Sequence, residues 1–219
     1  MRETVHFVRR TACLLSVWLL AGGAFAAQPL FLSEEKEVAL GQEEHNKIVS
    51  AFGLYRDKDL QQYVARVGQR IADQSSRPDL EYTFTILDDE MVNAMALPGG
   101  FIYVTRGLLI HLNSEAELAA VLGHEIAHVT ERHAIRSQRS QKLLEVLSQV
   151  AVFATGTPAA ATAAYDLGGL AGGLLLRGYS HEHELEADKF GAEFMAKAGY
   201  SPEAMLKTIE IRKAKDRIG

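Results

Sequence analysis

The sequence predicts an α+β fold that is mainly helical, with a small β-sheet beside one long helix. Three observations lead to this prediction. Hydrophobic residues recur at helical spacing over most of the chain. Two short runs, 82–87 and 101–105, are rich in the β-branched and aromatic residues typical of strands. Both runs lie between helical segments and do not alternate with them, which favours one small strand group over a βαβ sheet.

The N-terminal region predicts a signal peptide. Basic residues precede an uncharged run, Thr11 to Ala26, which ends in the small-residue pattern Ala24-Phe25-Ala26. At about 16 residues the run is shorter than the roughly 20 that a membrane-spanning helix needs. An uncleaved membrane anchor is the alternative. We expect residues 1–26 to be removed and residues 27–219 to form a single domain that is exported, either to the periplasm or out of the cell.

Composition excludes several classes of function. Cys13 and Trp18, which lie in the predicted leader, are the single Cys and Trp of the chain. The mature protein would therefore have no disulfide, no cysteine nucleophile and no thiolate metal site. A formal net charge of −5 also disfavours binding to nucleic acid, which requires clustered Lys and Arg. We expect no nucleic-acid partner.

The first two helices are predicted from their capping residues and periodicity. Ser33 precedes three glutamates, which the positive end of a helix dipole favours, and the helical pattern continues to about Ser50. The second helix, 59–73, carries apolar residues every three or four positions, at Leu60, Val64, Val67 and Ile71.

The strands and later helices follow from turn and capping signals. Asp88-Asp89 ends the first strand, and the turn Pro98-Gly99-Gly100 precedes the second. Ser114 caps a long helix that is expected to reach about Ile135. A further helix should run from about Tyr179 to Gly199, and Ser201-Pro202 should open the last one, with Pro at the first helical position.

The segment 150–176 is rich in Ala, Gly and Leu. Pro158, Asp166 and two glycine pairs interrupt it, so it contains no clean apolar run long enough to span a bilayer. We expect a buried helix with a Gly-rich connection, with a membrane-contacting segment as the alternative.

The long helix contains the sequence His124-Glu125-Ile126-Ala127-His128. Residues four apart lie on one helix face, so both imidazoles can meet a single zinc ion. Glu125 is rotated by roughly 100° from His124, which places its carboxylate where it could accept a proton from a water at the metal. Paired histidines that only filled a core would need partners for their ring nitrogens. The spacing therefore predicts a catalytic zinc site with Glu125 as general base.

A catalytic zinc site uses three protein ligands, so a third residue is needed. Glu131 and Ala134 stand where the metzincin pattern has Gly and His, which excludes that branch. The dense cluster of His and acidic residues at 181–188 remains, and within it Glu184 and Asp188 share one helix face. One could be the ligand and the other the partner of a ligand histidine. Spacing leaves open His181, Glu182 and His183 as competing ligands, and a solvated acidic helix face as the alternative for the whole cluster.

Three motifs in order resemble the M48 (Ste24-like) zinc metallopeptidases. They are Gly-His-Glu-Ile-Ala-His-Val at 123–129 followed by Arg132-His133, the stretch Glu184-x-x-Ala187-Asp188-x-x-Gly191, and Asn93 to Gly100 followed by Gly107-Leu108-Leu109. The resemblance covers roughly Glu34 to Ser201. It implies a zincin-like gluzincin domain that holds one Zn²⁺ through His124, His128 and Glu184, with Glu125 as base and Asp188 holding a ligand histidine.

The same resemblance implies that the stretch from Asn93 to Gly100 aligns the substrate. An exposed sheet edge there could bind an extended peptide by strand addition. The expected substrate-binding residues are Asn93, Ala94, Met95, Ala96, Gly99 and Gly100. The group that stabilises the oxyanion stays open among His133, Arg177, Tyr179, His181 and His183.

These observations lead to one functional hypothesis and two rivals. The first is an exported zinc endopeptidase that hydrolyses peptide bonds in unfolded or misassembled envelope proteins. The second is a chaperone-like factor that binds clients during envelope protein assembly and whose zinc site is latent. The third is a zinc hydrolase of non-peptide amides. Protein or peptide substrates are the expected partners, with peripheral contact to the membrane or to envelope proteins.

Overall fold

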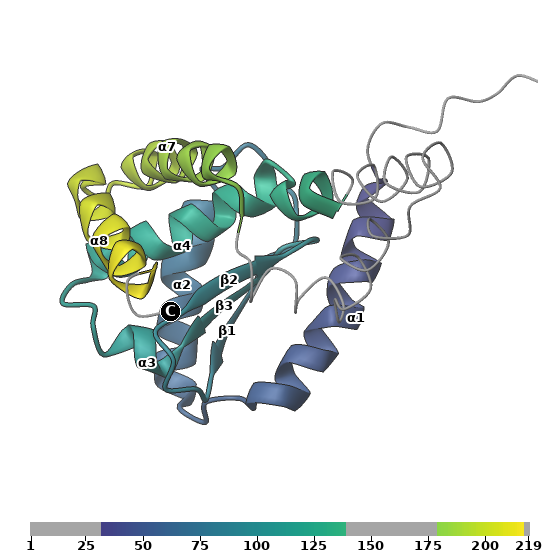
Figure 1. The fold of residues 1–219 in the computed structure, drawn as a ribbon, viewed down its shortest axis with the longest axis horizontal. Helices are drawn as coiled ribbons and strands as arrows, with labels where there is room; N and C mark the ends of the chain where they lie inside the picture. Colours follow the sequence, from purple (N-terminus) through teal and green to yellow (C-terminus); the bar gives the residue numbers. More distant parts are fainter. Residues whose placement is uncertain (1–31, 139–178, 217–219) are drawn as a thin grey trace, which may run out of the picture. The chain divides into compact units, whose positions relative to one another are not determined.

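The computed structural model describes residues 32–138 and 179–216 (Figure 1). The predicted signal peptide 1–26 and the Ala/Gly-rich segment 150–176 lie outside these residues. In chain order the elements are α1 (Glu34–Phe52), α2 (Lys58–Ala72), β1 (Thr83–Leu87), β2 (Ala94–Leu97), β3 (Phe101–Thr105), α3 (Arg106–Leu109), α4 (Glu115–Thr130), α7 (His181–Lys197), η2 (Pro202–Ala204) and α8 (Met205–Asp216). The expected fold class, mainly helical with a small sheet beside the long helix, is confirmed.

The sheet has three strands in the order β1-β3-β2. The central strand β3 pairs parallel with β1 and antiparallel with β2. The turn predicted at Pro98-Gly99-Gly100 joins β2 to β3, with positive φ at Gly99 (80°) and Gly100 (93°), a conformation that favours glycine. β2 is therefore an edge strand. Strand propensity did not predict it, since Ala-Met-Ala-Leu contains no β-branched or aromatic residue, and only the family resemblance suggested a sheet edge in this stretch.

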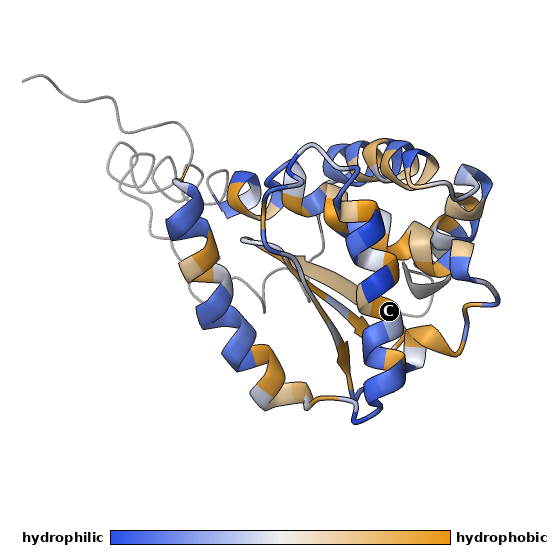
Figure 2. Cartoon of the chain, turned by 180° about the vertical axis from the view of Figure 1, so that it is seen from behind, coloured by the Kyte–Doolittle hydropathy of each residue, from blue (hydrophilic) through white to orange (hydrophobic). Residues whose placement is uncertain are grey.

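Successive side chains of each strand point to opposite faces of the sheet. Buried residues lie on both faces. One face packs against the helix layer that contains α2 and α4, and it contributes Phe84, Ile86, Ala96, Ile102 and Val104 to the main core. The other face packs against Ile48 of α1 through Leu87, Met95, Leu97, Phe101 and Tyr103. In Figure 2 the strands are coloured mostly as hydrophobic, whereas α1 carries hydrophilic and hydrophobic residues in alternation.

Helix α4 lies between the sheet and a second helical layer. It packs against α2 and β2 on one side and against α7 and α8 on the other (Figure 1). Thirteen of its residues, from Leu118 to Thr130, are buried. Across the described residues, every helix falls short of the length and apolar character that a bilayer crossing requires.

The long helix ends earlier than the sequence predicts. We expected it to reach about Ile135, but α4 ends at Thr130, and helical backbone resumes at 133–138. Arg132 interrupts it with φ 54°, the left-handed region that a non-glycine residue rarely adopts. The interruption redirects the chain just after the His-Glu-x-x-His segment.

Candidate metal centre

The two histidines of the motif lie on one face of α4 and are buried. His124 is 3% exposed and His128 is 2% exposed. Their Nε2 atoms are 2.9 Å apart. Since they are one helical turn apart, they can present these two nitrogens to one point. Glu125, next to His124 on the same helix, is also buried.

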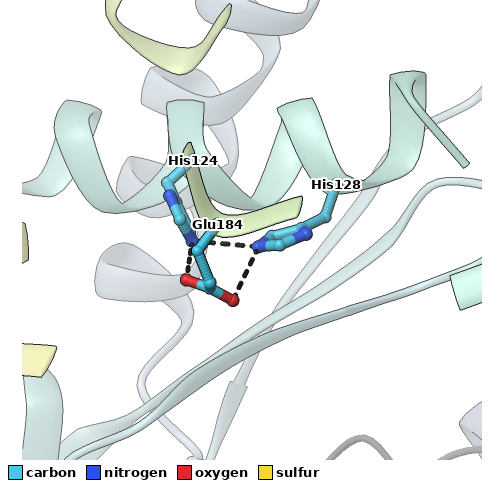
Figure 3. A group of neighbouring side chains, drawn as sticks. All are labelled: His124, His128 and Glu184. Carbon is cyan, nitrogen blue, oxygen red and sulfur yellow. Dashed lines mark hydrogen bonds and ion pairs between the residues drawn. The ribbon is translucent and has the colours of Figure 1, made fainter. Parts of the chain in front are cut away.

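Glu184 of α7 completes the group. Its Oε2 lies 3.5 Å from His124 Nε2 and its Oε1 lies 3.7 Å from His128 Nε2. Figure 3 shows the three side chains pointing toward one another, two from α4 and one from α7. Within the residues that the structure describes, they form the one group of His, Cys, Asp or Glu residues whose candidate ligand atoms all lie within 4.8 Å of one another.

A pair of glycines allows α7 to approach α4 this closely. Gly191 of α7 faces Gly123 of α4, and a Cβ at Gly191 would lie 2.8 Å from both the Gly123 carbonyl carbon and the His124 amide nitrogen. Any larger residue would push the two backbones apart. The contact is one residue before His124 in α4, so it places the acidic side chains of α7 beside the histidines.

The second nitrogen of His124 is held by Asp188. His124 Nδ1 lies 2.9 Å from Asp188 Oδ1. A carboxylate accepts, so Nδ1 carries the proton and Nε2 keeps its lone pair for a metal. Asp188 is four residues after Glu184, and therefore both carboxylates reach His124 from one face of α7.

The second nitrogen of His128 meets a histidine. Its Nδ1 lies 2.8 Å from His133 Nδ1, and His133 Nε2 lies 2.9 Å from Glu186 Oε2. His133 is fully buried, and burial lowers its pKa to about 4. Arg136 donates to the same carboxylate at 2.6 Å and, with His133, lowers the pKa of Glu186. Sequence reasoning did not find this chain of contacts. Its only signal was Arg132-His133 in the family motif.

The three other candidates for the third ligand, His181, Glu182 and His183, lie away from the Nε2 atoms of His124 and His128. His183 stacks on His133, with ring centroids 4.4 Å apart, and its Nδ1 is 3.4 Å from Ser137 Oγ. His181 and Glu182 are exposed on the first turn of α7. The structure thus brings Glu184 to the two histidines and leaves these three side chains outside the group.

The donor set suits zinc. Two neutral imidazole nitrogens and one carboxylate oxygen are ligand types that zinc accepts, and three protein ligands leave a position for water or substrate. The buried Nε2 atoms of His124 and His128 face each other, and two lone pairs at 2.9 Å repel unless a cation or proton lies between them. The residues present therefore fit a metal ion.

The predicted substrate residues lie along β2 and the turn that follows it. Met95 faces the α1 side of the sheet and Ala96 the α4 side. Asn93 and Ala94 lie at the start of the strand, where the Asn93 carbonyl pairs with Thr105. In the turn, added Cβ atoms at Gly99 and Gly100 would meet backbone of Val38 and of Glu81.

Tyr179 contacts both β2 and His128, one of the three residues of the candidate metal group (His124, His128 and Glu184). Its ring stacks on His128 with centroids 3.9 Å apart, and its hydroxyl donates to the Ala96 carbonyl at 3.3 Å. Burial, together with the nearby charges of Glu125 and Glu184, raises the pKa of Tyr179 well above its usual value, so the hydroxyl stays protonated and remains a donor. Of the candidate oxyanion stabilisers, Arg177 lies outside the described residues, and Tyr179 is a neutral donor beside His128. His133, in contrast, is occupied in the core.

Comparison with known proteins identifies relatives over most of this region. Residues 58–214 match the model of peptidase family M48. The chain is 30% identical to a beta-barrel assembly-enhancing protease of Yersinia pestis over 80% of its own length, and 28% identical to that of Escherichia coli K12 over 82%. It is 33% identical to mitochondrial metalloendopeptidase OMA1 of Schizosaccharomyces pombe over 79%. The matches cover 37%, 38% and 51% of those proteins, so the chain spans about a third of the length of the two bacterial relatives.

Proposed function

The chain belongs to peptidase family M48, and from this premise we propose that it is a zinc-dependent endopeptidase that hydrolyses peptide bonds in unfolded or misassembled envelope proteins. One observation carries the proposal. Two buried Nε2 atoms and the Glu184 carboxylate converge on one point, and a partner holds the far nitrogen of each histidine.

His124, His128 and Glu184 would hold one Zn²⁺, with Asp188 fixing the tautomer of His124. When bound, zinc would lower the pKa of a water toward 7 and polarise a peptide carbonyl. Glu125 is the general base: it takes the proton of the attacking water and delivers it to the leaving amine nitrogen. Its burial in α4, beside His124, keeps bulk water from competing for that proton.

The substrate would bind as an extended strand along β2. An edge strand has a neighbouring strand on one side only, and an extended peptide can add to its outer side. Asn93, Ala94, Met95 and Ala96 supply this edge, and Gly99 and Gly100 give the turn that ends it. Backbone pairing is independent of side chains, so this mode suits a protease of unfolded segments. The hydroxyl of Tyr179, which now donates to the Ala96 carbonyl, would turn to the oxyanion once a peptide takes its place.

The proposed compartment is the periplasm or the exterior, reached after removal of residues 1–26. Residues 27–219 would then form one catalytic domain. The envelope substrates are proposed from the names of the bacterial relatives, which enhance beta-barrel assembly. A ligand set of nitrogen and oxygen donors is compatible with such a compartment, because it contains no thiol to oxidise.

The test measures zinc content and casein cleavage in parallel. We expect the unaltered protein to hold one zinc per chain and to cleave casein. Glu125→Gln should keep the zinc and lose cleavage, whereas Glu182→Gln, at an exposed glutamate of α7, should change neither. Glu184→Ala should lose zinc.

Two results would overturn the proposal. If the unaltered protein holds zinc but cleaves no protein, the peptidase role falls and client binding is favoured. If Glu184→Ala retains zinc while His183→Ala loses it, the assignment of Glu184 as the third ligand is wrong.

A further inference from the structure

His133 is a buried histidine with both ring nitrogens in contact with other side chains. Its exposed fraction is 0%, and its Nδ1 and Nε2 lie 2.8 Å from His128 Nδ1 and 2.9 Å from Glu186 Oε2. The contact with Glu186 joins residues 53 positions apart in the chain. The catalytic roles proposed above make no use of it.

The position of each proton in this chain of contacts can be worked out from the acceptors at its two ends. Glu186 accepts a hydrogen bond from Arg136 and offers only oxygens, so His133 Nε2 carries a proton. A neutral imidazole has one N–H, and therefore His133 Nδ1 has a lone pair. His128 Nδ1, at 2.8 Å, must then donate to it, since two lone pairs at that distance would repel. His128 is left with its lone pair on Nε2, the atom that faces Glu184.

The backbone break after α4 makes the contact geometrically feasible. In a continuous helix, residue 133 would be rotated about 140° from residue 128 and would face away from it. The positive φ of Arg132 interrupts the helix at that point and changes this rotation. A non-glycine residue in this conformation costs about 1 kcal/mol or more. Because the strain at Arg132 lets His133 reach His128, we take this contact to have a function.

We propose that His133 is a positioning residue for the metal ligand His128, and that the chain of contacts from Arg136 through Glu186 and His133 fixes the tautomer and ring orientation of that ligand. The inference rests on the proposed ligand set. His133 does for His128 what Asp188 does for His124, with a neutral imidazole placed between the ligand and the carboxylate. Metal-ligating histidines are generally held through their second nitrogen, and loss of that partner typically weakens metal affinity by about 10 to 100-fold.

A packing role for His133 makes a different prediction. The ring stacks on His183, and a phenyl ring could take over such a stack. His133→Phe preserves the aromatic shape and removes both nitrogens. His133→Asn loses the ring but can place its Oδ1 near the position of Nδ1, where it can accept the hydrogen bond from His128. The two variants therefore separate hydrogen bonding from shape.

The experiment measures the zinc dissociation constant of metal-free protein by competition with a chelator. We expect His133→Phe to bind zinc about 10 to 100-fold more weakly, and His133→Asn to recover most of that loss. His183→Phe, the control on the neighbouring ring, should bind zinc as the unaltered protein does. Nitrogen–proton correlation spectra of ¹⁵N-histidine-labelled protein should show the Nδ1–H form of His128, and this form should become mixed in His133→Phe.

Glu186→Ala keeps the test valid if His133→Phe does not fold, because Glu186 is only partly buried. This variant should also weaken zinc binding, by about tenfold. Unchanged zinc affinity in Glu186→Ala and His133→Phe, or an Asn variant no better than the Phe variant, would overturn the inference while the proposed function stands. Absence of zinc binding in the unaltered protein would overturn both.

Discussion

Replacing Gly191 by alanine tests how the approach of two helices builds the metal group. An alanine Cβ at this position would lie 2.8 Å from the Gly123 carbonyl carbon and 2.8 Å from the His124 amide nitrogen. Non-bonded carbon atoms settle at about 3.5–4.0 Å. α7 would therefore have to move away from α4 by about 1 Å, because both contacts are with backbone and no side chain can rotate aside.

The magnitude follows from two opposing effects. Overpacking costs about 1–3 kcal/mol, whereas Gly→Ala inside a helix gains up to about 1 kcal/mol of helix propensity. A shift of about 1 Å would also stretch the His124–Asp188 contact from 2.9 Å to beyond hydrogen-bonding distance. We expect a net loss of about 1–3 kcal/mol of unfolding free energy and a zinc affinity reduced by about tenfold or more.

Thermal unfolding and zinc competition measure the two effects separately. Ala196→Gly, at an exposed position of the same helix, measures the propensity contribution in the absence of a clash. If Gly191→Ala were more stable than the unaltered protein by the amount that Ala196→Gly loses, and bound zinc equally well, the close approach would have no energetic role. The reasoning from the glycine pair would then be refuted.

Three further predictions concern stability. Glu37→Ala should lower the free energy of unfolding, measured in urea, by about 3–5 kcal/mol. Glu37 is 1% exposed and pairs with Arg77 and Arg132, so its removal takes a counter-charge from both guanidinium groups. A loss no larger than that of Glu35→Ala, at an exposed position, would contradict this prediction. Burial lowers the pKa of His45 below 6.5, so the unfolded chain binds more protons and stability falls as the pH drops below 6.5. The melting temperature of His45→Gln should therefore fall less steeply than that of the unaltered protein between pH 7 and pH 5, and equal slopes would count against it. Removing the metal with EDTA should lower the melting temperature, since a ligand that binds only the folded state stabilises it, and restoring zinc should reverse the change.

Local patterns predicted most of the fold, because they depend on neighbours in the sequence. Capping residues placed the starts of α1 and α4, after Ser33 and Ser114, and the side chain of Ser114 accepts from the Glu117 amide as a cap should. The starts of α2 and α7 lie within two residues of those expected from the sequence pattern. Local propensity missed strand β2 because its residues favour strands only weakly, and the expected sheet edge there came from family resemblance alone. Pairing with β3 provides the stabilisation that the local sequence does not.

The site residues also fall into two groups, those that spacing within one helix predicts and those that depend on how the helices pack. The spacing of His124 and His128 predicted a shared helix face, since both are in one helix. The choice of Glu184 over its neighbours came from family resemblance, because it depends on how α7 crosses α4. The contact between His133 and Glu186 could not be predicted from spacing, since it depends on a left-handed Arg132, and residue type rarely indicates that conformation.

One helix interface therefore carries the whole metal group. Helix α7 supplies Glu184. It also supplies Asp188, which contacts His124 directly, and Glu186, which contacts His128 through His133. Any motion that separates α7 from α4 would remove one of the proposed ligands and release the other two together. The proposed zinc binding and the docking of these helices would then be thermodynamically linked: zinc would stabilise the docked helices by the same free energy by which docking strengthens zinc binding. The glycine contact, which lies outside the metal group, can control metal affinity for this reason.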